Sequence, residues 1–221
     1  MPLEQRELLK QGAEALGLGL SDGQCDALLA YQAMLIKWNQ VYNLTAVRKP
    51  EDMLTHHLLD SLAVLPSLER YLTNRPPRLL DVGSGGGLPG VVLAIMLPAL
   101  SVTCVDTVGK KASFVRQVAG ELKLPNLNAE HSRVENLRTE PFDVIASRAF
   151  ASLSDFTRLT RHLLATDGVW TAMKGKPPTE EMAALPPESD VFHVEQLAVP
   201  GLDAERCLVW IRKSPPVVRA P

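Results

Sequence analysis

The feature that most constrains this chain is a glycine-rich turn, residues 83–90, set between two apolar segments. A short apolar run, residues 78–82, leads into the turn, and a second one, residues 90–96, follows it. Glycine allows positive φ angles and lets a ligand approach the main chain, because it has no Cβ atom. A strand–turn–helix unit of this kind is typical of open α/β sheets, in which ligands bind beyond the carboxyl ends of the strands. The turn therefore predicts a parallel α/β sheet with a ligand site at this position.

The sequence beyond residue 76 supports that architecture, because short apolar runs alternate with helical patterns. The predicted strands are residues 78–82, 100–105, 144–146 and 169–173, and the predicted helices between them are residues 90–96, 110–122 and 154–164. This alternation predicts βαβ units in a parallel sheet with helices on both faces. Two last apolar runs, residues 191–199 and 206–213, predict an antiparallel pair that closes one edge of the sheet.

The first 75 residues are expected to form a helical extension. A first helix is predicted to end near Gly17, a second to begin at Ser21-Asp22, and a third to cover residues 51–68. Arg75-Pro76-Pro77 marks the expected boundary. We therefore predict an extension over residues 1–75, a ligand-binding domain over residues 76–213 and a flexible tail over residues 214–221.

Composition indicates a globular protein, since 46% of the 221 residues are hydrophobic and 22% are charged. The sequence has no apolar run of membrane-spanning length and does not begin like a signal peptide. Cys25, Cys104 and Cys207 lie far apart, so we expect reduced, buried thiols in a cytoplasmic protein, without a metal site. A net charge of −2 gives no basic footprint, so a nucleic-acid partner would need a local basic patch.

The chemistry of the ligand is indicated by two patterns. Asp106 follows the second predicted strand, 23 residues after Gly83, where a carboxylate can accept hydrogen bonds from the ribose hydroxyls of an adenosine. The stretch 81–87 reads Asp-x-Gly-x-Gly-x-Gly, which is similar to the first motif of class I methyltransferases. A dinucleotide pattern can also be drawn through Gly85, Gly87 and Gly90. A small NAD-dependent oxidoreductase, or a nucleotide-binding module without catalysis, is therefore the alternative to a methyltransferase.

The residues after the fourth predicted strand limit the nucleophile that a methyltransferase of this kind would use. Exocyclic amines typically call for an Asn/Asp-Pro-Pro-aromatic corner there, whereas this chain has Ser147-Arg148-Ala149-Phe150. Methylation at carbon 5 of a pyrimidine needs a nucleophilic cysteine, and none of the three is well placed. A ring nitrogen such as guanine N7 already presents a lone pair. These absences weakly favour a ring nitrogen, for which no general base is expected.

In combination, seven motifs resemble the bacterial 16S ribosomal RNA guanine-N7 methyltransferase family, called RsmG or GidB (glucose-inhibited division protein B). They are Lys37-Trp38-Asn39, Tyr42-Asn43-Leu44-Thr45, His57-Leu58-Leu59-Asp60-Ser61, residues 81–90, Ser132-Arg133-Val134-Glu135, residues 147–153, and Lys174-Gly175. The resemblance covers residues 20–213. It implies a Rossmann-like, mostly parallel seven-stranded sheet with an antiparallel last strand, S-adenosylmethionine as cofactor, and 16S rRNA or the small ribosomal subunit as substrate. We expect the chain to act as a monomer.

The resemblance also implies site residues. The predicted cofactor-binding residues are Asp81, Gly83, Gly85, Gly87, Leu88, Val134, Glu135 and Arg148, to which the ribose argument adds Asp106. Asn43, Arg148 and Lys174 are candidates on the substrate side, although Asn43 is equally explained as a turn residue. Ser84 and Gly86 replace the Thr and Pro that relatives often carry, which should loosen the turn slightly.

Two further expectations concern polar side chains outside the turn. His57 and Asp60 lie one helical turn apart and could hydrogen-bond across the junction between the extension and the sheet. A basic face for RNA could form from a set of side chains that would otherwise be solvated: Lys110, Lys111, Arg116, Arg158, Arg161 and His162.

Overall fold

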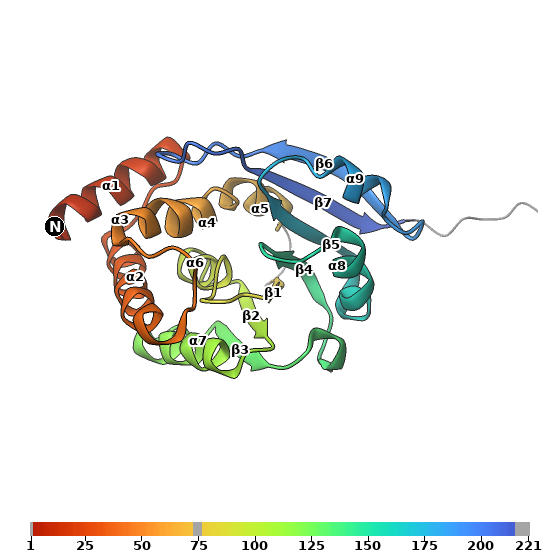
Figure 1. Cartoon of the computed structure of the whole chain (residues 1–221), viewed down its shortest axis with the longest axis horizontal. Helices are drawn as coiled ribbons and strands as arrows, with labels where there is room; N and C mark the ends of the chain where they lie inside the picture. The colour runs from red at the N-terminus through yellow and green to blue at the C-terminus, as the bar shows by residue number, and fades with distance from the viewer. Residues whose placement is uncertain (1, 73–76, 215–221) are drawn as a thin grey trace, which may run out of the picture.

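A mixed sheet runs through the part of the chain that the computed structural model describes, residues 2–72 and 77–214 (Figure 1). Within these residues its seven strands have the order β3 (Leu127–His131), β2 (Ser101–Asp106), β1 (Arg78–Val82), β4 (Phe142–Ser147), β5 (Leu164–Lys174), β7 (Cys207–Lys213) and β6 (Ser189–Gln196). The first five are parallel, and β7 is antiparallel to both of its neighbours. This confirms the predicted sheet, including its antiparallel last strand.

Strand β3 is the one that the apolar runs did not locate. It forms the edge of the sheet, and only Leu127 and Ala129 on it are buried, while Asn128, Glu130 and His131 are exposed. An edge strand needs one apolar face only, so its sequence alternates and lacks the continuous apolar run of a strand buried on both faces.

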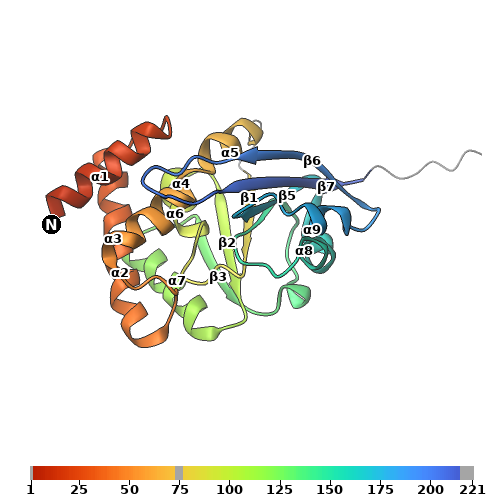
Figure 2. The same ribbon diagram turned by 45° about the horizontal axis from the view of Figure 1, so that its top comes forward.

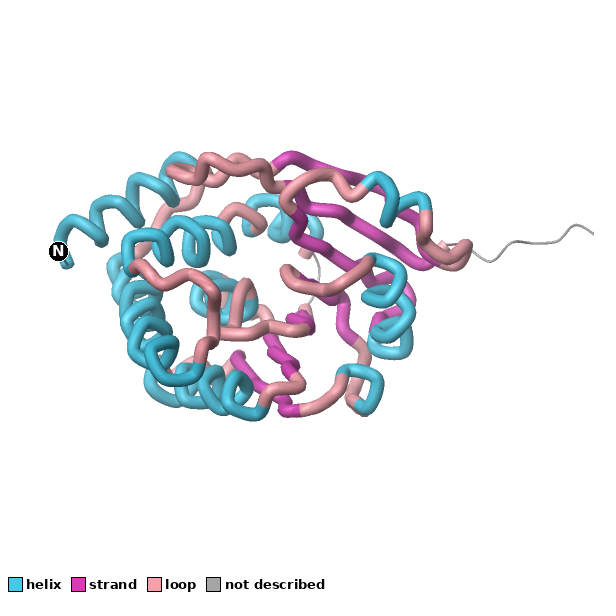
Figure 3. The backbone as a smooth tube through the Cα atoms, in the orientation of Figure 1, coloured by secondary structure: helices cyan, strands magenta, loops and turns pink. Residues whose placement is uncertain are grey.

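Helices cover both faces of the sheet, as Figure 3 shows. Helices α2 (Asp22–Tyr42), α6 (Gly90–Met96) and α7 (Gly109–Glu121) share one apolar cluster with one face. Helix α8 (Leu153–Thr160), followed by η3 (Arg161–Leu163), belongs to a second cluster on the other face, where Phe156 and Trp170 are fully buried. The predicted two-faced arrangement is therefore correct.

The N-terminal residues are helical, as expected, but the third predicted helix is not continuous. Helix α1 (Pro2–Ala15) precedes α2, and Ser21 caps α2 in a reciprocal capping box with Gln24. Where one helix over residues 51–68 was predicted, the chain forms α3 (Pro50–Met53), the π-helical turn η1 (Leu54–Leu59), α4 (Asp60–Leu62) and α5 (Leu65–Tyr71). Pro66 accounts for the new start at α5, because proline lacks the N–H that a helix interior requires.

Two short elements complete the fold, η2 (Val134–Asn136) and α9 (Thr179–Ala183). Cys25, Cys104 and Cys207 are buried free thiols, as predicted. No helix in the described residues has both the length and the apolar character needed to cross a membrane. The same residues contain no group of three or more His, Cys, Asp or Glu side chains placed to hold a metal. The expected boundary at Arg75-Pro76 and the tail beyond residue 214 lie outside the described residues.

Candidate functional site

The glycine turn joins β1 to α6 and combines one open position with several packed ones. Gly83, Gly85 and Gly87 have φ angles of +68°, +59° and +88°, which L side chains rarely adopt. A Cβ atom on Gly87 would lie 2.4 Å from Cγ2 of Val91, whereas one on Gly83 would meet no atom within 4 Å. Gly83 therefore faces free space beside the end of β1, as a main-chain position that contacts a ligand should.

Asp81 lies under this turn with its side chain fully buried. Its Oδ2 accepts a hydrogen bond from the N–H of Gly90, at 2.9 Å, which holds the start of α6. Its Oδ1 is buried and has no hydrogen-bond partner among the described residues. Burial raises the pKa of Asp81 to about 7, against the opposing effects of the Gly90 N–H and the positive charge of Arg148. A buried carboxylate oxygen without a partner is costly, so this atom fits a donor supplied by a ligand.

Asp106 ends β2 and has an exposed fraction of only 7%. Its Oδ1 accepts the N–H of Val108 at 2.8 Å, and its Oδ2 accepts the N–H of Gly85 at 3.0 Å. The carboxylate thus ties the glycine turn to the start of α7. Each carboxylate oxygen accepts about two hydrogen bonds, so both oxygens retain capacity for ribose hydroxyls.

Three more of the predicted cofactor residues, Leu88, Val134 and Glu135, differ in how far their side chains are exposed. Val134 and Glu135 lie in η2, after β3, and a hydrogen bond from the Ser132 N–H to the Asp106 carbonyl, at 3.2 Å, keeps this segment beside the end of β2. Val134 is buried and Glu135 half-buried. Leu88 is 3% exposed and packs in the core, so only its main chain is available on the ligand side.

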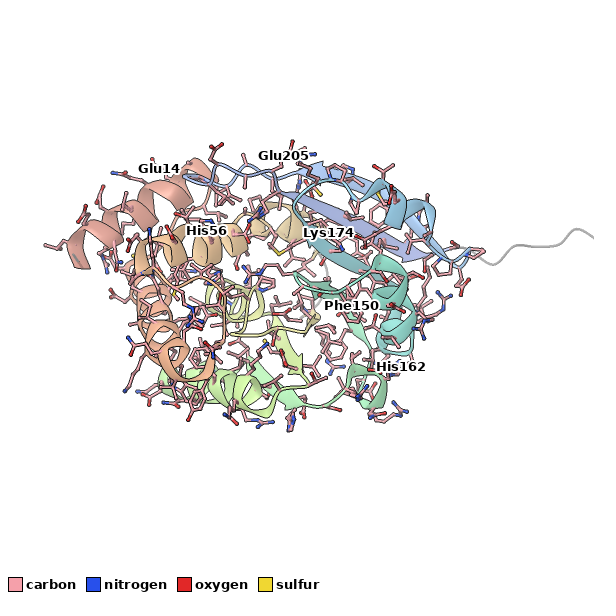
Figure 4. The ribbon with its side chains drawn as sticks, viewed as in Figure 1. Glu14, His56, Phe150, His162, Lys174 and Glu205 are labelled. Atoms are coloured by element: carbon pink, nitrogen blue, oxygen red, sulfur yellow. The ribbon has the colours of Figure 1, made fainter. Side chains whose placement is uncertain are left out.

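A second feature at the same edge of the sheet is a cavity of about 280 Å³. Figure 4 labels two of its lining residues, His56 on η1 and Lys174 at the end of β5. It is lined by Val47, His56, His57, Asp60, Arg148, Met173, Lys174, Gly175 and Arg206. Arg148 and Lys174 stand at the carboxyl ends of parallel strands and Arg206 at the start of antiparallel β7, so all three reach one edge. This cavity therefore combines three cationic side chains at the ligand-binding edge.

Asp60 organises two of these cations. Its side chain is nearly fully buried, with Oδ2 at 3.3 Å from Nη1 of Arg148 and Oδ1 at 2.8 Å from Nε of Arg206. Arg148 also donates to the main-chain carbonyl of His56, at 3.1 Å. The predicted hydrogen bonding of Asp60 across the junction is therefore confirmed, with Arg148 and Arg206 as its partners.

His57 hydrogen-bonds within the extension, to Thr45 and His56, so the prediction that it bonds across the junction is wrong. Its Nδ1 is 2.9 Å from the carbonyl of His56, which can only accept, so Nδ1 carries the proton and Nε2 accepts the hydroxyl of Thr45 at 2.8 Å. Burial lowers the pKa of His57 to about 4, assisted by the charge of Arg148. The ring is therefore neutral at pH 7 and fixed in one tautomer.

Comparison with known proteins assigns the family. A sequence model of the family GidB, described as rRNA small subunit methyltransferase G, matches residues 24–209. The chain belongs to this family.

Relatives named for the methyltransferase G activity cover almost the whole chain. Ribosomal RNA small subunit methyltransferase G of Polaromonas naphthalenivorans is 62% identical over 211 residues, covering 94% of this chain and 95% of that protein. The protein of the same name from Leptothrix cholodnii is 62% identical over 207 residues, with the same two coverages.

Solved structures show the fold that the methyltransferase G family shares with other methyltransferases. TrmN from Thermus thermophilus aligns with a TM-score of 0.56 at 17% identity, covering 73% of this chain and 53% of that one. The ribosomal protein L11 methylase of Lactobacillus delbrueckii subsp. bulgaricus aligns with a TM-score of 0.54 at 15% identity, covering 71% and 79%. At these identities the likeness shows the class I methyltransferase fold alone.

Two of the predicted substrate-side residues form hydrogen bonds with other residues of the chain. Asn43 is the left-handed C-cap of α2, with φ at 50°, and its Oδ1 accepts a hydrogen bond from Arg48 at 2.8 Å. It is thus a turn residue, whichever further role it has. Lys174 is held by Glu181 of α9, with its Nζ at 3.0 Å from both carboxylate oxygens.

The six side chains suggested as one basic face do not form one. Lys110, Lys111 and Arg116 lie on α7, whereas Arg158, Arg161 and His162 belong to α8 and η3 across the sheet. In Figure 4, His162 lies well away from His56 and Lys174. Both groups are basic, but the sheet lies between α7 and α8 and keeps the two groups apart.

Arg206 and Glu181 are site residues that the sequence patterns did not indicate. Arg206 is 146 residues from Asp60, its ion-pair partner. Glu181 lies on a short helix with no buried residues and accepts the Leu153 N–H at 2.8 Å in addition to binding Lys174. In the sequence, Arg206 was recognisable only as a charged residue at the start of a predicted strand. Glu181 was recognisable only as an acidic residue that follows Lys174, at the end of another.

Proposed function

We propose that this chain transfers a methyl group from S-adenosylmethionine to N7 of a guanine in the 16S rRNA of the small ribosomal subunit. Membership of the methyltransferase G family supports the reaction and the substrate. The observation in the structure that carries the proposal is the common edge of the sheet, which holds both the open glycine turn and a cavity with three cations. That arrangement suits a nucleoside cofactor beside an anionic substrate.

The residues of the turn fit the cofactor. The open space at Gly83, the unpartnered Oδ1 of Asp81 and the remaining acceptor capacity of Asp106 match the sulfonium-linked methionine chain, its ammonium group and the ribose. Val134 and Glu135 would meet the adenine, and Gly85, Gly87 and Leu88 would shape the turn. When bound, the cofactor supplies an electrophilic methyl group on a positively charged sulfur.

The chain would act by alignment and electrostatics. In such a transfer the lone pair of guanine N7 would form the bond to the methyl carbon as the carbon–sulfur bond breaks, so the residues of the chain would need only to hold the two groups in line. No proton leaves N7, and no general base is required. Arg148, with Lys174 and Arg206, would hold phosphate or guanine oxygen, with Asp60 fixing the arginine orientations.

The reaction is tested directly by transfer of labelled methyl groups. Purified chain, labelled S-adenosylmethionine and small-subunit particles from a strain that lacks this enzyme should give label in 16S rRNA, mapping to N7 of one guanine. Label in a small molecule or a protein would overturn the substrate assignment. Such a substrate would place the chain in the cytoplasm, where we propose that it acts as a monomer.

Ligand binding separates this proposal from its alternative. S-adenosylhomocysteine should raise the melting temperature of the chain, whereas NADH should not, and the reverse result would favour an oxidoreductase. Asp106→Asn should weaken S-adenosylhomocysteine binding by tenfold or more, because the amide accepts fewer hydrogen bonds than the carboxylate. Asp190→Asn is the matched control, since Asp190 lies on edge strand β6, at the far end of the strand order from β2, where it pairs with Arg212.

A further inference from the structure

An exposed surface lies beside the proposed cofactor site, where the end of α2 meets the start of α7. We name it the α2–α7 ledge and define it as Val41, Tyr42, Val108 and Lys110. Figures 1 and 2 both show α2 and α7 side by side. The exposed fractions of Val41, Tyr42 and Val108 are 68%, 40% and 44%, although all three are apolar or aromatic. Large apolar side chains gathered in the open mark an interaction surface.

The ledge holds an aromatic ring and a free cation. The Nζ of Lys110 lies 5.0 Å from the centroid of the Tyr42 ring, a cation–π contact. Among the described residues, no carboxylate lies within ion-pair distance of this ammonium group. Trp38 packs against both Tyr42 and buried Phe114 of α7, with ring centroids 5.1 Å and 5.3 Å apart. The ring is thus held in place, while the flexible lysine above it can move.

The ledge adjoins the proposed cofactor site through the main chain. The N–H of Val108 donates to Oδ1 of Asp106 at 2.8 Å. A Cβ atom on Gly85 would lie 3.7 Å from the carbonyl oxygen of Leu44, two residues after Tyr42. The α7 side of the ledge therefore lies close to Asp106, the acid expected to bind the ribose. The α2 side lies close to the glycine turn.

The charge next to the ledge is positive. Arg48 is exposed, and its guanidinium donates a hydrogen bond of 2.8 Å to Oδ1 of Asn43. Asn43 follows Tyr42 directly in the sequence. Lys111, half-buried, has its Nζ 4.0 Å from Oδ2 of Asp106. An exposed ring flanked by cations matches a single-stranded nucleotide, which carries a flat base and an anionic phosphate.

We propose that the α2–α7 ledge binds an unpaired nucleotide of the RNA substrate next to the guanine that is methylated. The base stacks on Tyr42 in the place of the Lys110 ammonium, which moves to the adjacent phosphate. This assignment rests on the proposed function, because it identifies where the RNA of that reaction lies. It also gives Asn43 a supporting role, as the residue that positions Arg48.

Steady-state methylation of small-subunit particles tests the ledge. Tyr42→Ala should raise KM for the particles about tenfold with kcat unchanged, and Tyr42→Phe should behave as wild type. Lys110→Ala should raise KM by a smaller factor and lower the salt dependence of log KM by about one. Binding of S-adenosylhomocysteine should be unchanged in all three, since none of these side chains is expected to touch it.

A matched control lies at the opposite edge of the sheet. Phe192 on β6 is also 40% exposed, and the guanidinium of Arg212 lies 5.4 Å from the centroid of its ring. There the cation is already paired with Asp190, at 2.9 Å. Phe192→Ala should leave KM unchanged. An equal effect of Phe192→Ala and Tyr42→Ala, or none for Tyr42→Ala, overturns the ledge assignment.

The activity of the wild-type chain distinguishes a failure of the ledge assignment from a failure of the proposed function. If wild-type chain does not label 16S rRNA, the proposed function fails. If it labels the RNA and Tyr42→Ala does so with the same KM, only the ledge assignment fails.

A short RNA distinguishes RNA from a ribosomal protein as the partner. A fluorescein-labelled, twelve-nucleotide single-stranded RNA should bind wild type more tightly than Tyr42→Ala, measured by anisotropy at low salt. If the oligonucleotide binds both equally, or neither, while Tyr42→Ala still raises KM for particles, the ledge binds a protein and the RNA assignment is wrong.

Discussion

The phenolic hydroxyl of Tyr31 donates a hydrogen bond of 2.7 Å to the main-chain carbonyl of Gly86, which joins α2 directly to the glycine turn. Both groups are buried, and burial raises the pKa of Tyr31 well above its usual value, so the donor keeps its proton. A Cβ atom on Gly86 would lie 2.7 Å from Cδ1 of Leu35, also on α2. The helical extension is therefore part of the support of the turn, and its residues should influence cofactor binding.

Tyr31→Phe tests this support. The substitution leaves the Gly86 carbonyl buried without its donor, which should lower the free energy of unfolding by ~1–2 kcal/mol. It should also weaken S-adenosylhomocysteine binding several-fold, because the turn is less restrained. Tyr71→Phe is the control, since the Tyr71 hydroxyl donates to the Asp167 carbonyl at 2.8 Å, at the other end of β5 from Lys174. Calorimetry that gives the same affinity for both variants would show that α2 does not restrain the turn.

Gly83→Ala should separate backbone strain from loss of ligand space. Its φ of +68° costs an alanine ~1 kcal/mol, but the new methyl group meets no protein atom. Gly17, after α1, is a close match, with φ of +76° and equally open space. Both alanine variants should therefore lose similar unfolding free energy, while only Gly83→Ala loses tenfold or more in S-adenosylhomocysteine affinity. Equal affinities would remove Gly83 from the cofactor site.

The sequence predicts best those parts of the fold that are buried on both faces. Strands β1, β2, β4 and β5 are apolar runs because helices cover them on either side, and the glycine turn is recognisable because its backbone conformations demand glycine. Edge strand β3 escapes this logic, since three of its five residues face solvent. The π-helical turn η1 likewise has no distinct pattern, because its apolar spacing resembles that of an ordinary helix.

The polar partners in the candidate site could not be predicted from spacing. Arg206 reaches Asp60 because β7 pairs with β5 in the antiparallel direction, which places the start of β7 at the carboxyl ends of the parallel strands. That juxtaposition is a property of strand order, not of any local pattern. Asp106 was identifiable because it follows an apolar run directly, and Asp81 because it opens the glycine motif of residues 81–87.

Asp81 should make the free chain less stable as the pH rises. Its pKa is about 7 in the folded chain and 3.8 as an ordinary aspartate, so between these values the folded chain retains a proton that the unfolded chain releases. The free energy of unfolding should therefore fall across this window, by up to ~4 kcal/mol for a shift of this size. Asp81→Asn, which cannot ionise, should lack this fall. Urea unfolding at pH 5 and pH 8 measures the difference.

Cofactor binding should show the opposite trend with pH. A methionine ammonium group beside Oδ1 favours the ionised form of Asp81, so S-adenosylhomocysteine should bind more tightly at pH 8 than at pH 6. Asp81→Asn should bind it weakly at both. Wild-type affinity that does not vary over this range would remove the Asp81 charge from the cofactor site.

His57 should act in the reverse sense and partly conceal the effect of Asp81. Its pKa is about 4 when folded and 6.5 as an ordinary histidine, so in acid the unfolded chain binds a proton that the folded chain does not. Stability should therefore be lost as the pH falls from 6.5 to 4, by up to ~3 kcal/mol. Because Asp81 gains stability over nearly the same range, the wild-type profile should be flatter than that of either variant. Asp81→Asn should expose the acid loss and His57→Gln the alkaline loss in urea unfolding, and three parallel profiles would contradict both assignments.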